Sequence, residues 1–434
     1  MTGPALWGGH ECTLNRMGDV WRDQTRLTGH HDRIGDLDHF ADLGLQAVRY
    51  PVLWERTETT RGEWDWQWPD LRLTRLRTLG VRPIVGLLHH GSGPAWTDLL
   101  DPDFAEGLAR HAARTAERYP WVQDWTPVNE PLTTARFSAL YGHWYPHRRD
   151  ERDFWSALLN QIDATRLSMR AIRRVNPEAR LIQTEDFGAT FGTIPCASQV
   201  RFENDRRLMT WDLLCGRVAA GHPMFERLAG FYLGDRLLAI SDDPCPPDVI
   251  GMNHYVTSDR FLDHRLDRYP TTSHGANAEL AYADVEAVRA MSRPRGWREH
   301  LCLLWARYGL PLAITECHLG SEPDEQIRWF DECWRTARDL SAEGVTIEAV
   351  TAWSLLGAVD WDSLLTETRG RYEAGAFDVS SGHPVAGDLA SWLRILSHGG
   401  ALSGAATGIG WWSRDDRRCF HPELDDPPDG ALAA

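Results

Sequence analysis

The sequence predicts an α/β protein, built as a single (β/α)8 TIM barrel with extended loops at the C-terminal face of its strands. Short apolar runs alternate with longer amphipathic stretches through most of the chain, which is typical of repeated βα units. Polar residues follow directly after several of these runs, where a barrel carries its chemistry. We expect residues 1–396 to form the barrel and residues 397–434 to form an extended or partly disordered tail.

The expected strands are short apolar runs, and the expected helices show a helical spacing of apolar residues. The strands cover residues 5–7, 46–51, 82–88, 122–128, 180–184, 248–253, 311–315 and 347–353. The helices cover residues 36–43, 71–79, 104–118, 154–175, 297–308, 324–343 and 385–396. Gly44, Gly80 and Gly344 each follow such a stretch and mark helix ends. Eight strands that alternate with helices in this way are enough to form a complete (β/α)8 barrel.

Two segments are longer than ordinary βα loops. Residues 186–247 are irregular with helical pieces, and residues 256–296 are rich in Arg, Asp and Tyr. Long connections in a compact domain are usually functional, and in a barrel they lie beside the active site. We therefore expect a decorated active-site face.

The composition excludes several classes of protein. The formal net charge is −16, which disfavours nucleic acid and anionic membranes as partners. The mean hydropathy is −0.42, and no run approaches the roughly 18 apolar residues of a spanning helix. The first residues lack the basic and apolar segments of a signal peptide, and the eight cysteines show no CxxC spacing. We expect a cytoplasmic protein with reduced thiols.

The sequence contains no lysine, so all 46 basic residues counted are arginine. Schiff-base chemistry, with a carbonyl substrate or with pyridoxal phosphate, needs a lysine. A Walker-type phosphate loop also needs one. We therefore exclude these chemistries, and we expect neither a cofactor nor a metal ion.

Two glutamates stand at the ends of expected strands. In the stretch from Asp124 to Pro131, Asn129 and Glu130 directly precede the proline that stops the strand. The apolar run that begins at residue 312 ends in Glu316. Retaining glycoside hydrolysis needs two such carboxylates, one as acid/base and one as nucleophile.

Three motifs support a family resemblance. They are Thr126-Pro-Val-Asn-Glu-Pro131, Ile314-Thr-Glu316 and Ala352-Trp-Ser-Leu-Leu356. Together, in this order at the fourth, seventh and eighth strands, they resemble the β-glucosidase-like barrels of glycoside hydrolase family 1 over residues 5–396. The resemblance implies a retaining β-glycosidase that works through a covalent glycosyl-enzyme intermediate, with Glu130 as acid/base and Glu316 as nucleophile.

The resemblance also implies a sugar-binding set around this pair. Its members are Asn15, His90, Asn129, Asn253, Tyr255, Trp353, Asp360 and Trp361. Asn129 would bind the sugar 2-hydroxyl, Tyr255 would position the nucleophile, and Trp353 would form the floor under the sugar ring. Arg49, an odd charge inside the second strand, is expected to pair with the nucleophile, because a buried arginine needs a partner.

Two members of this set depart from the family pattern. Asn15 stands where the family has a sugar-clamping glutamine, and Asp360 where it has a glutamate. Each side chain is one methylene shorter, so we expect weak activity on simple β-glucosides. The substrate is expected to be a small glycoside or oligosaccharide. A different or decorated sugar, a sugar-binding barrel without turnover and a metal-dependent barrel hydrolase remain as alternatives, and the oligomeric state stays open.

Overall fold

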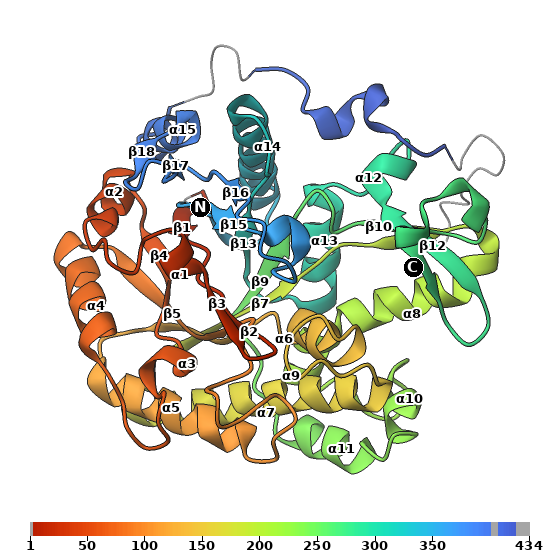
Figure 1. Ribbon diagram of the computed structural model, residues 1–434, viewed down its shortest axis with the longest axis horizontal. Helices are drawn as coiled ribbons and strands as arrows, with labels where there is room; N and C mark the ends of the chain where they lie inside the picture. The colour runs from red at the N-terminus through yellow and green to blue at the C-terminus, as the bar shows by residue number, and fades with distance from the viewer. Residues whose placement is uncertain (1–2, 401–406, 422–434) are drawn as a thin grey trace.

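A computed structural model describes residues 3–400 and 407–421 of the chain (Figure 1). Eight parallel strands close into a barrel in the order β1-β14-β13-β9-β7-β6-β5-β4. They are β1 (Ala5–Gly9), β4 (Ala47–Pro51), β5 (Arg82–His89), β6 (Asp124–Asn129), β7 (Arg180–Asp186), β9 (Val249–His254), β13 (Leu312–Cys317) and β14 (Ile347–Ala352). Each corresponds to one of the expected strands, and the predicted (β/α)8 barrel is confirmed.

A layer of buried side chains fills the interior of the barrel. It contains Trp7, Ala47, Ile84, Ile182, Val249, Ala313 and Ala349, which come from different strands. The large indole of Trp7 is accommodated because the neighbouring positions on β4, β13 and β14 are alanines. A filled interior means that a ligand can enter the barrel only from one end.

Amphipathic helices surround the barrel and bury their apolar faces against it (Figure 1). They are α2 (Asp36–Asp42), α4 (Gln67–Leu79), α5 (Phe104–Arg118), α7 (Glu151–Val175), α13 (Trp297–Tyr308), α14 (Pro323–Ala342) and α15 (Asp388–Ser397). Gly80 ends α4 in the left-handed conformation with φ 73°, as the sequence predicts. Helix α4 begins before the expected residue 71. Helix α15 begins after the expected residue 385, because Val385–Ala386 forms a short strand, β18.

The insert after β7 pairs with the insert after β9 in a small second sheet, which the sequence did not predict. Its strands are β8 (Thr190–Gly192), β10 (Arg260–Asp263), β11 (His274–Ala276) and β12 (Ala281–Glu286). The helices of the first insert are α8 (Ala197–Arg207), α9 (Met209–Leu214), α10 (Phe225–Ala229) and α11 (Gly234–Asp242), and α12 (Ala287–Ala290) follows β12. Figure 1 shows β10 and β12 beside the end of α8.

The remaining short elements lie in the loops between barrel strands. They are β2 (Leu14–Met17), β3 (Val20–Asp23), α1 (Gln24–Leu27), α3 (Trp54–Thr57), α6 (Pro131–Ala135), η1 (Arg136–Leu140), η2 (Ile194–Cys196), η3 (Leu266–Arg268), η4 (Thr271–Ser273), β15 (Ala358–Val359), η5 (Trp361–Ser363), β16 (Tyr372–Glu373) and β17 (Phe377–Asp378). None of the helices in the described ranges combines the length and the hydrophobicity that a membrane-spanning segment requires.

The expected tail, 397–434, lies partly outside the described residues, because 401–406 and 422–434 are not described. Within it, η7 (Trp411–Ser413) and η8 (Asp415–Arg417) lie over α14 and α12 (Figure 1). Trp412 is buried, donates from Nε1 to Glu332 Oε2 at 2.9 Å and meets Trp329 edge to face at 4.9 Å. The paired tryptophans of the tail therefore dock on the barrel through Trp412.

Candidate active site

A cavity of about 720 Å³ opens where the barrel strands end, and both predicted catalytic glutamates line it. Its lining also includes His90, Tyr255, Trp353 and Trp361 from the predicted set. These side chains come from segments that are far apart in the sequence but converge because parallel strands end at the same face of a barrel.

Glu316 lies on β13 and is held by two donors. Arg49, on β4, donates from Nη1 to Glu316 Oε1 at 2.6 Å, and the Tyr255 hydroxyl donates to Oε2. Burial raises the pKa of Glu316, while the Arg49 guanidinium and the Tyr255 hydroxyl act in the opposite direction. The expected pairing of Arg49 with this glutamate is present in the structure.

Glu130 directly follows β6, with φ 47° in the left-handed region, and this turn aims its side chain into the cavity. Its Oε1 accepts a hydrogen bond from Asn253 Nδ2 at 2.5 Å, and His90 Nε2 lies 3.7 Å from its Oε2. Burial raises the pKa of Glu130 well above its ordinary value, and the negative charge of Glu316 raises it further. The two carboxyl groups therefore differ, because a cation contacts Glu316 whereas Glu130 has a neutral amide donor.

Asn129 connects the supports of the two glutamates. Its Oδ1 accepts from Arg49 Nη2 at 2.6 Å and from Thr184 Oγ1 at 2.7 Å. Asn253, on β9, accepts from Thr315 Oγ1 at 2.6 Å while it donates to Glu130. These buried side chains are fully engaged with one another, which fixes their rotamers before any ligand binds.

Aromatic rings form the walls of the cavity. The ring of Trp353 stacks on His89 with centroids 5.6 Å apart, and the guanidinium carbon of Arg49 lies 4.8 Å from the Trp353 centroid. The ring of Trp361 lies edge to face against His90 at 5.6 Å. Burial and the charge of Arg49 lower the pKa of His90 to about 3, so His90 is neutral at ordinary pH. A sugar ring needs this combination of apolar platform and neutral polar groups.

Comparisons with known proteins show which proteins this chain is similar to. The phospho-cellobiase of Klebsiella oxytoca is 23% identical over 377 residues, which covers 79% of this chain and 79% of that protein. The β-glucosidase 42 of Arabidopsis thaliana is 23% identical over 419 residues and covers 83% of this chain and 82% of that protein. These relatives match the chain over most of its barrel, in agreement with the three strand-end motifs. The chain is thus similar to β-glucosidase-like proteins of glycoside hydrolase family 1 in its sequence and in its barrel fold.

Solved structures agree on the fold. A family 1 β-glucosidase from Thermotoga maritima superposes with a TM-score of 0.73 and 18% identity, covering 93% of this chain and 99% of that one. The same protein from Thermotoga maritima, in complex with cyclophellitol, gives the same TM-score of 0.73. No family model matches the sequence. The low identities show how far the chain has diverged.

Four residues of the predicted sugar-binding set do not line this cavity: Asn15, Asn129, Asn253 and Asp360. Asn129 and Asn253 belong to the network around the two glutamates, whereas Asp360 and Asn15 bond to other protein groups. Asp360 is buried and accepts from Arg22 Nη2 at 2.5 Å, from Arg371 N at 2.8 Å and from Arg369 N at 3.2 Å. Asn15 donates to the backbone carbonyl of His90 at 3.1 Å. Both side chains are committed to protein groups, so their shorter length carries no prediction about sugar hydroxyls. The expectation of an altered clamp at these positions therefore lacks structural support.

Glu11 is a carboxylate in the cavity that sequence reasoning missed. It follows β1, and its Oε1 accepts from Thr13 N at 2.9 Å and lies 3.8 Å from His89 Nε2. Burial raises the pKa of Glu11 to about 7, with the charge of Glu316 adding to this and Thr13 opposing it. An acidic residue just beyond a barrel strand is the signal in the sequence that could have predicted it.

The inserts contribute a second group that sequence reasoning missed. Arg136, Arg206 and Arg207 line the cavity from η1 and from the end of α8. No motif marks these three arginines. Because every basic residue of the chain is an arginine, an arginine in the sequence does not by itself indicate a binding site. Among the described residues, no three His, Cys, Asp or Glu side chains gather in a way that could hold a metal ion.

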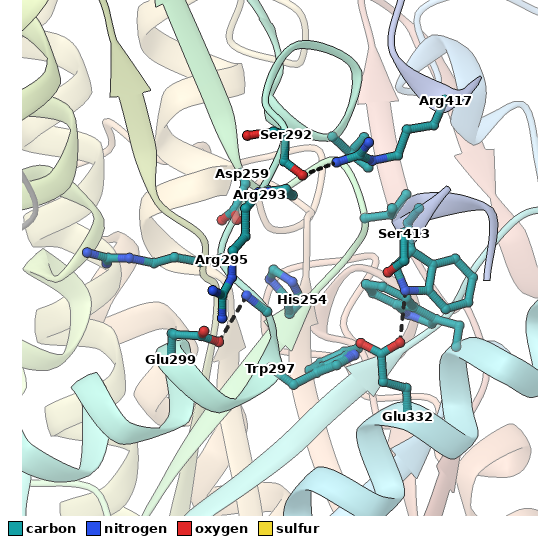
Figure 2. A pocket seen from close by; sticks show the side chains of 16 residues that line it. His254, Asp259, Ser292, Arg293, Arg295, Trp297, Glu299, Glu332, Ser413 and Arg417 are labelled. Carbon is teal, nitrogen blue, oxygen red and sulfur yellow. Dashed lines mark hydrogen bonds between the residues drawn. The ribbon is translucent and has the colours of Figure 1, made fainter. Parts of the chain in front are cut away.

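A second, smaller cavity of about 270 Å³ lies between the end of β9 and the C-terminal segment (Figure 2). Figure 2 shows His254, Trp297 and Arg417 around it, with Arg417 donating to the Ser292 carbonyl at 2.8 Å. The residues described as lining it include none of the predicted site residues. Of these two cavities, only the larger one is lined by the two predicted catalytic glutamates.

Proposed function

We propose that the protein hydrolyses β-linked glycosides with retention of anomeric configuration, with Glu316 as nucleophile and Glu130 as acid/base. The observation that carries this proposal is the contrast between two buried carboxyls in one cavity. Arg49 and Tyr255 donate to Glu316, which favours its ionised form, whereas Glu130 receives an amide donor from Asn253. Pairs of carboxyls whose surroundings separate their pKa values divide into an acid and a nucleophile.

The reaction follows from this division in two steps. Glu316 attacks the anomeric carbon while Glu130 gives its proton to the glycosidic oxygen, so the C–O bond breaks and a glycosyl ester forms on Glu316. Glu130 then takes a proton from water, which attacks the anomeric carbon and releases Glu316. Two inversions at the same carbon leave the product in the β-configuration.

The sugar would lie on Trp353, with His90 directed at its ring hydroxyls. The Oδ1 of Asn129 is already bonded to Arg49 and Thr184, so Asn129 would bind the 2-hydroxyl through its Nδ2. Glu11 supplies the charged acceptor that the sequence assigned to Asn15 and Asp360. It lies in the same cavity as the nucleophile, and its backbone N–H is fixed by Ser354 Oγ at 2.8 Å. A carboxylate can accept two hydroxyl hydrogen bonds, which suits the outer hydroxyls of a hexose.

The names of the curated relatives, a phospho-cellobiase and β-glucosidases, favour a β-glucoside or a decorated glucoside as the sugar. A different hexoside or pentoside remains the alternative, because Glu11 replaces the clamp that the motifs predicted. A panel of 4-nitrophenyl β-glycosides that differ only in the sugar would decide between them.

The mechanism is tested by the product and by a rescued variant. Proton NMR should show the β-anomer first, and the α-anomer as the first product would contradict retention. Glu316→Gly should lose turnover and regain part of it with azide or formate, giving an α-configured adduct, because the small anion fills the gap on the nucleophile side. A native protein that binds sugars in calorimetry but hydrolyses none of the panel would instead support the sugar-binding alternative.

A further inference from the structure

Three arginines gather in the cavity on the side of Glu130. Arg136 begins the π-helix η1, which follows the strand that carries Glu130, and Arg206 and Arg207 end α8, in the insert after the next strand. All three line the cavity. In the barrel order, β7, whose insert carries α8, lies next to β6, which Glu130 follows, and two strands away from β13, which carries Glu316.

The donors of these arginines are only partly used. Arg207 is 4% exposed, and among the described residues its Nε and Nη1 have no hydrogen-bond partner, although both atoms are buried. Within the described chain, the Nε atoms of Arg136 and Arg206 are also buried and have no hydrogen-bond partner. Buried donors without acceptors are costly, and a buried guanidinium without a counter-charge is more so. A ligand with hydrogen-bond acceptors would satisfy these buried donors when it binds in the cavity.

The negative charges of Asp186, Glu203 and Asp259 act favourably on Arg207, but none of these acids accepts a hydrogen bond from its Nε or Nη1 in the described chain. Glu203 forms an ion pair with Arg206, and Asp186 accepts from Ser258 Oγ at 2.6 Å. Burial lowers the pKa of Arg207, and the charge of Arg136 is among the causes that lower it further. The cluster therefore keeps a cation whose charge is poorly solvated.

The other cavity-lining arginines are paired. Arg260 donates to Asp284 Oδ1 at 2.8 Å, and Arg289 Nε lies 3.8 Å from Glu286 Oε2. Among the arginines that line the cavity in the described chain, buried donors without a hydrogen-bond partner therefore occur at Arg136, Arg206 and Arg207.

We propose that Arg136, Arg206 and Arg207 form a subsite for an anionic group, a phosphate ester or a carboxylate, carried by the leaving group of the substrate. This rests on the proposed function, because Glu130 protonates the leaving group and the arginines lie on its side of the cavity. Guanidinium groups recognise both anions through paired, charge-assisted hydrogen bonds. The natural substrate is then a glycoside of an acidic aglycone.

The test compares phenyl β-glycosides that carry a para carboxylate, a para phosphate ester or a para carboxamide. For each variant, the ratio of kcat/KM between an anionic substrate and the neutral carboxamide is measured. The intrinsic reactivities of the leaving groups are the same for every variant, so only a change in this ratio reports on the subsite. We expect Arg207→Gln to lower the ratio by about tenfold or more, equivalent to about 1.4 kcal/mol. If the ratio for the phosphate ester falls further than the ratio for the carboxylate in Arg207→Gln, the subsite binds phosphate esters. The opposite order identifies carboxylates as its ligands.

Arg201→Gln is the matched control. Arg201 lies on the same helix as Arg207, but it is exposed and does not line the cavity. Its replacement by glutamine removes the same positive charge. Its ratio should equal that of the native protein. An Arg207→Gln ratio equal to that of Arg201→Gln would overturn the subsite and leave the proposed glycosidase intact.

If the native protein hydrolyses no glycoside, the proposed function fails and binding decides the subsite alone. Thermal unfolding is then followed with and without inorganic phosphate at constant ionic strength. Phosphate should raise the Tm of the native protein and of Arg201→Gln but not of Arg207→Gln, because a ligand stabilises only the state that binds it. Equal rises in all three proteins, or none, would overturn the subsite.

Discussion

Replacing Arg49 by methionine tests whether Arg49 keeps Glu316, the proposed nucleophile, in its ionised form. Arg49 is 6% exposed and donates to Glu316 Oε1 and to Asn129 Oδ1, each at 2.6 Å, and to the Thr315 carbonyl at 2.9 Å. Methionine keeps an unbranched apolar side chain in the same space but removes the charge and the donors. We expect Arg49→Met to fold and to lose most of its turnover.

The size of the loss follows from these contacts. A hydrogen bond to a charged group contributes about 1.5–3 kcal/mol. If the contact to Glu316 persists in the transition state, its removal lowers kcat/KM by about 10- to 150-fold. The second contact holds Asn129, which is proposed to bind the sugar, so its loss adds to the effect.

The pH profile separates this role from simple packing. Burial raises the pKa of Glu316, and Arg49 acts against that rise. Without the guanidinium the pKa rises further, so Glu316 takes up its proton at a higher pH. Because attack needs the ionised carboxylate, the acid limb of kcat/KM should move to higher pH in Arg49→Met, and activity should be lost first at the acid end.

Arg22→Met provides the control for stability. Arg22 also forms a buried ion pair, with Asp360 at 2.5 Å, but neither residue lines the cavity. Breaking a buried pair costs about 3–5 kcal/mol, so the Tm of this variant should fall as well. Its acid limb should match that of the native protein. Identical acid limbs in Arg49→Met and Arg22→Met would refute the reasoning.

Three further predictions concern Glu130, Glu11 and Trp412. Glu130→Ala should slow hydrolysis of alkyl glycosides by about 10²–10⁴-fold while sparing glycosides of acidic phenols, measured as kcat/KM against leaving-group pKa; equal losses in both classes would contradict its role as acid. The pKa of Glu11 is about 7, so KM for the sugar should fall as pH rises through that value. In Glu11→Gln, KM should no longer depend on pH in this range. If the dependence persists, another group is responsible for it. Trp412→Ala should lower the free energy of unfolding by about 3–5 kcal/mol in urea without changing kcat/KM, and an unchanged unfolding midpoint would mean that the C-terminal segment is undocked in solution.

The barrel and the positions of the two glutamates could be predicted because their signals are local. A short apolar run followed by a polar residue marks a strand end wherever it occurs, and the closure of the barrel brings those ends together. Glu130 and Glu316 share the cavity for this reason, although β6 and β13 are far apart in the sequence. The pairing of Arg49 followed from burial alone, since a cation inside a barrel strand must find a carboxylate.

The small second sheet could not be predicted, because its pairing is not local. The three residues of β8 pair in parallel with β10, across the whole intervening insert. Three residues carry no readable period, and their partner is chosen by tertiary packing. The same inserts carry Arg206 and Arg207, so their place beside Glu130 was equally hidden.

The placements of Asn15 and Asp360 show that the direction in which a loop side chain points could not be predicted from the sequence. Their assignment assumed that the loops follow the path that the family motifs imply. Asp360 instead has φ 59° and turns its carboxylate toward Arg22 of β3, a partner far away in the sequence. A one-residue change in loop path reverses whether a side chain faces a cavity or the protein. Such a choice depends on the partner and not on the local sequence.

The contrast between strands and loops explains how a barrel of this fold can keep two glutamates in one cavity while its sequence is only about 23% identical to its relatives. Arg49 and Asn253, which hold the two glutamates, lie on barrel strands β4 and β9, where a shift would disturb the whole sheet. Glu11 and the arginines that we assign to the leaving group lie in loops and inserts, which can change without unfolding the barrel. Identities near 23% with both glutamates in one cavity are therefore what a change of substrate with constant chemistry would produce. It follows that a search for the natural substrate should vary the aglycone, and above all its charge, at least as widely as the sugar.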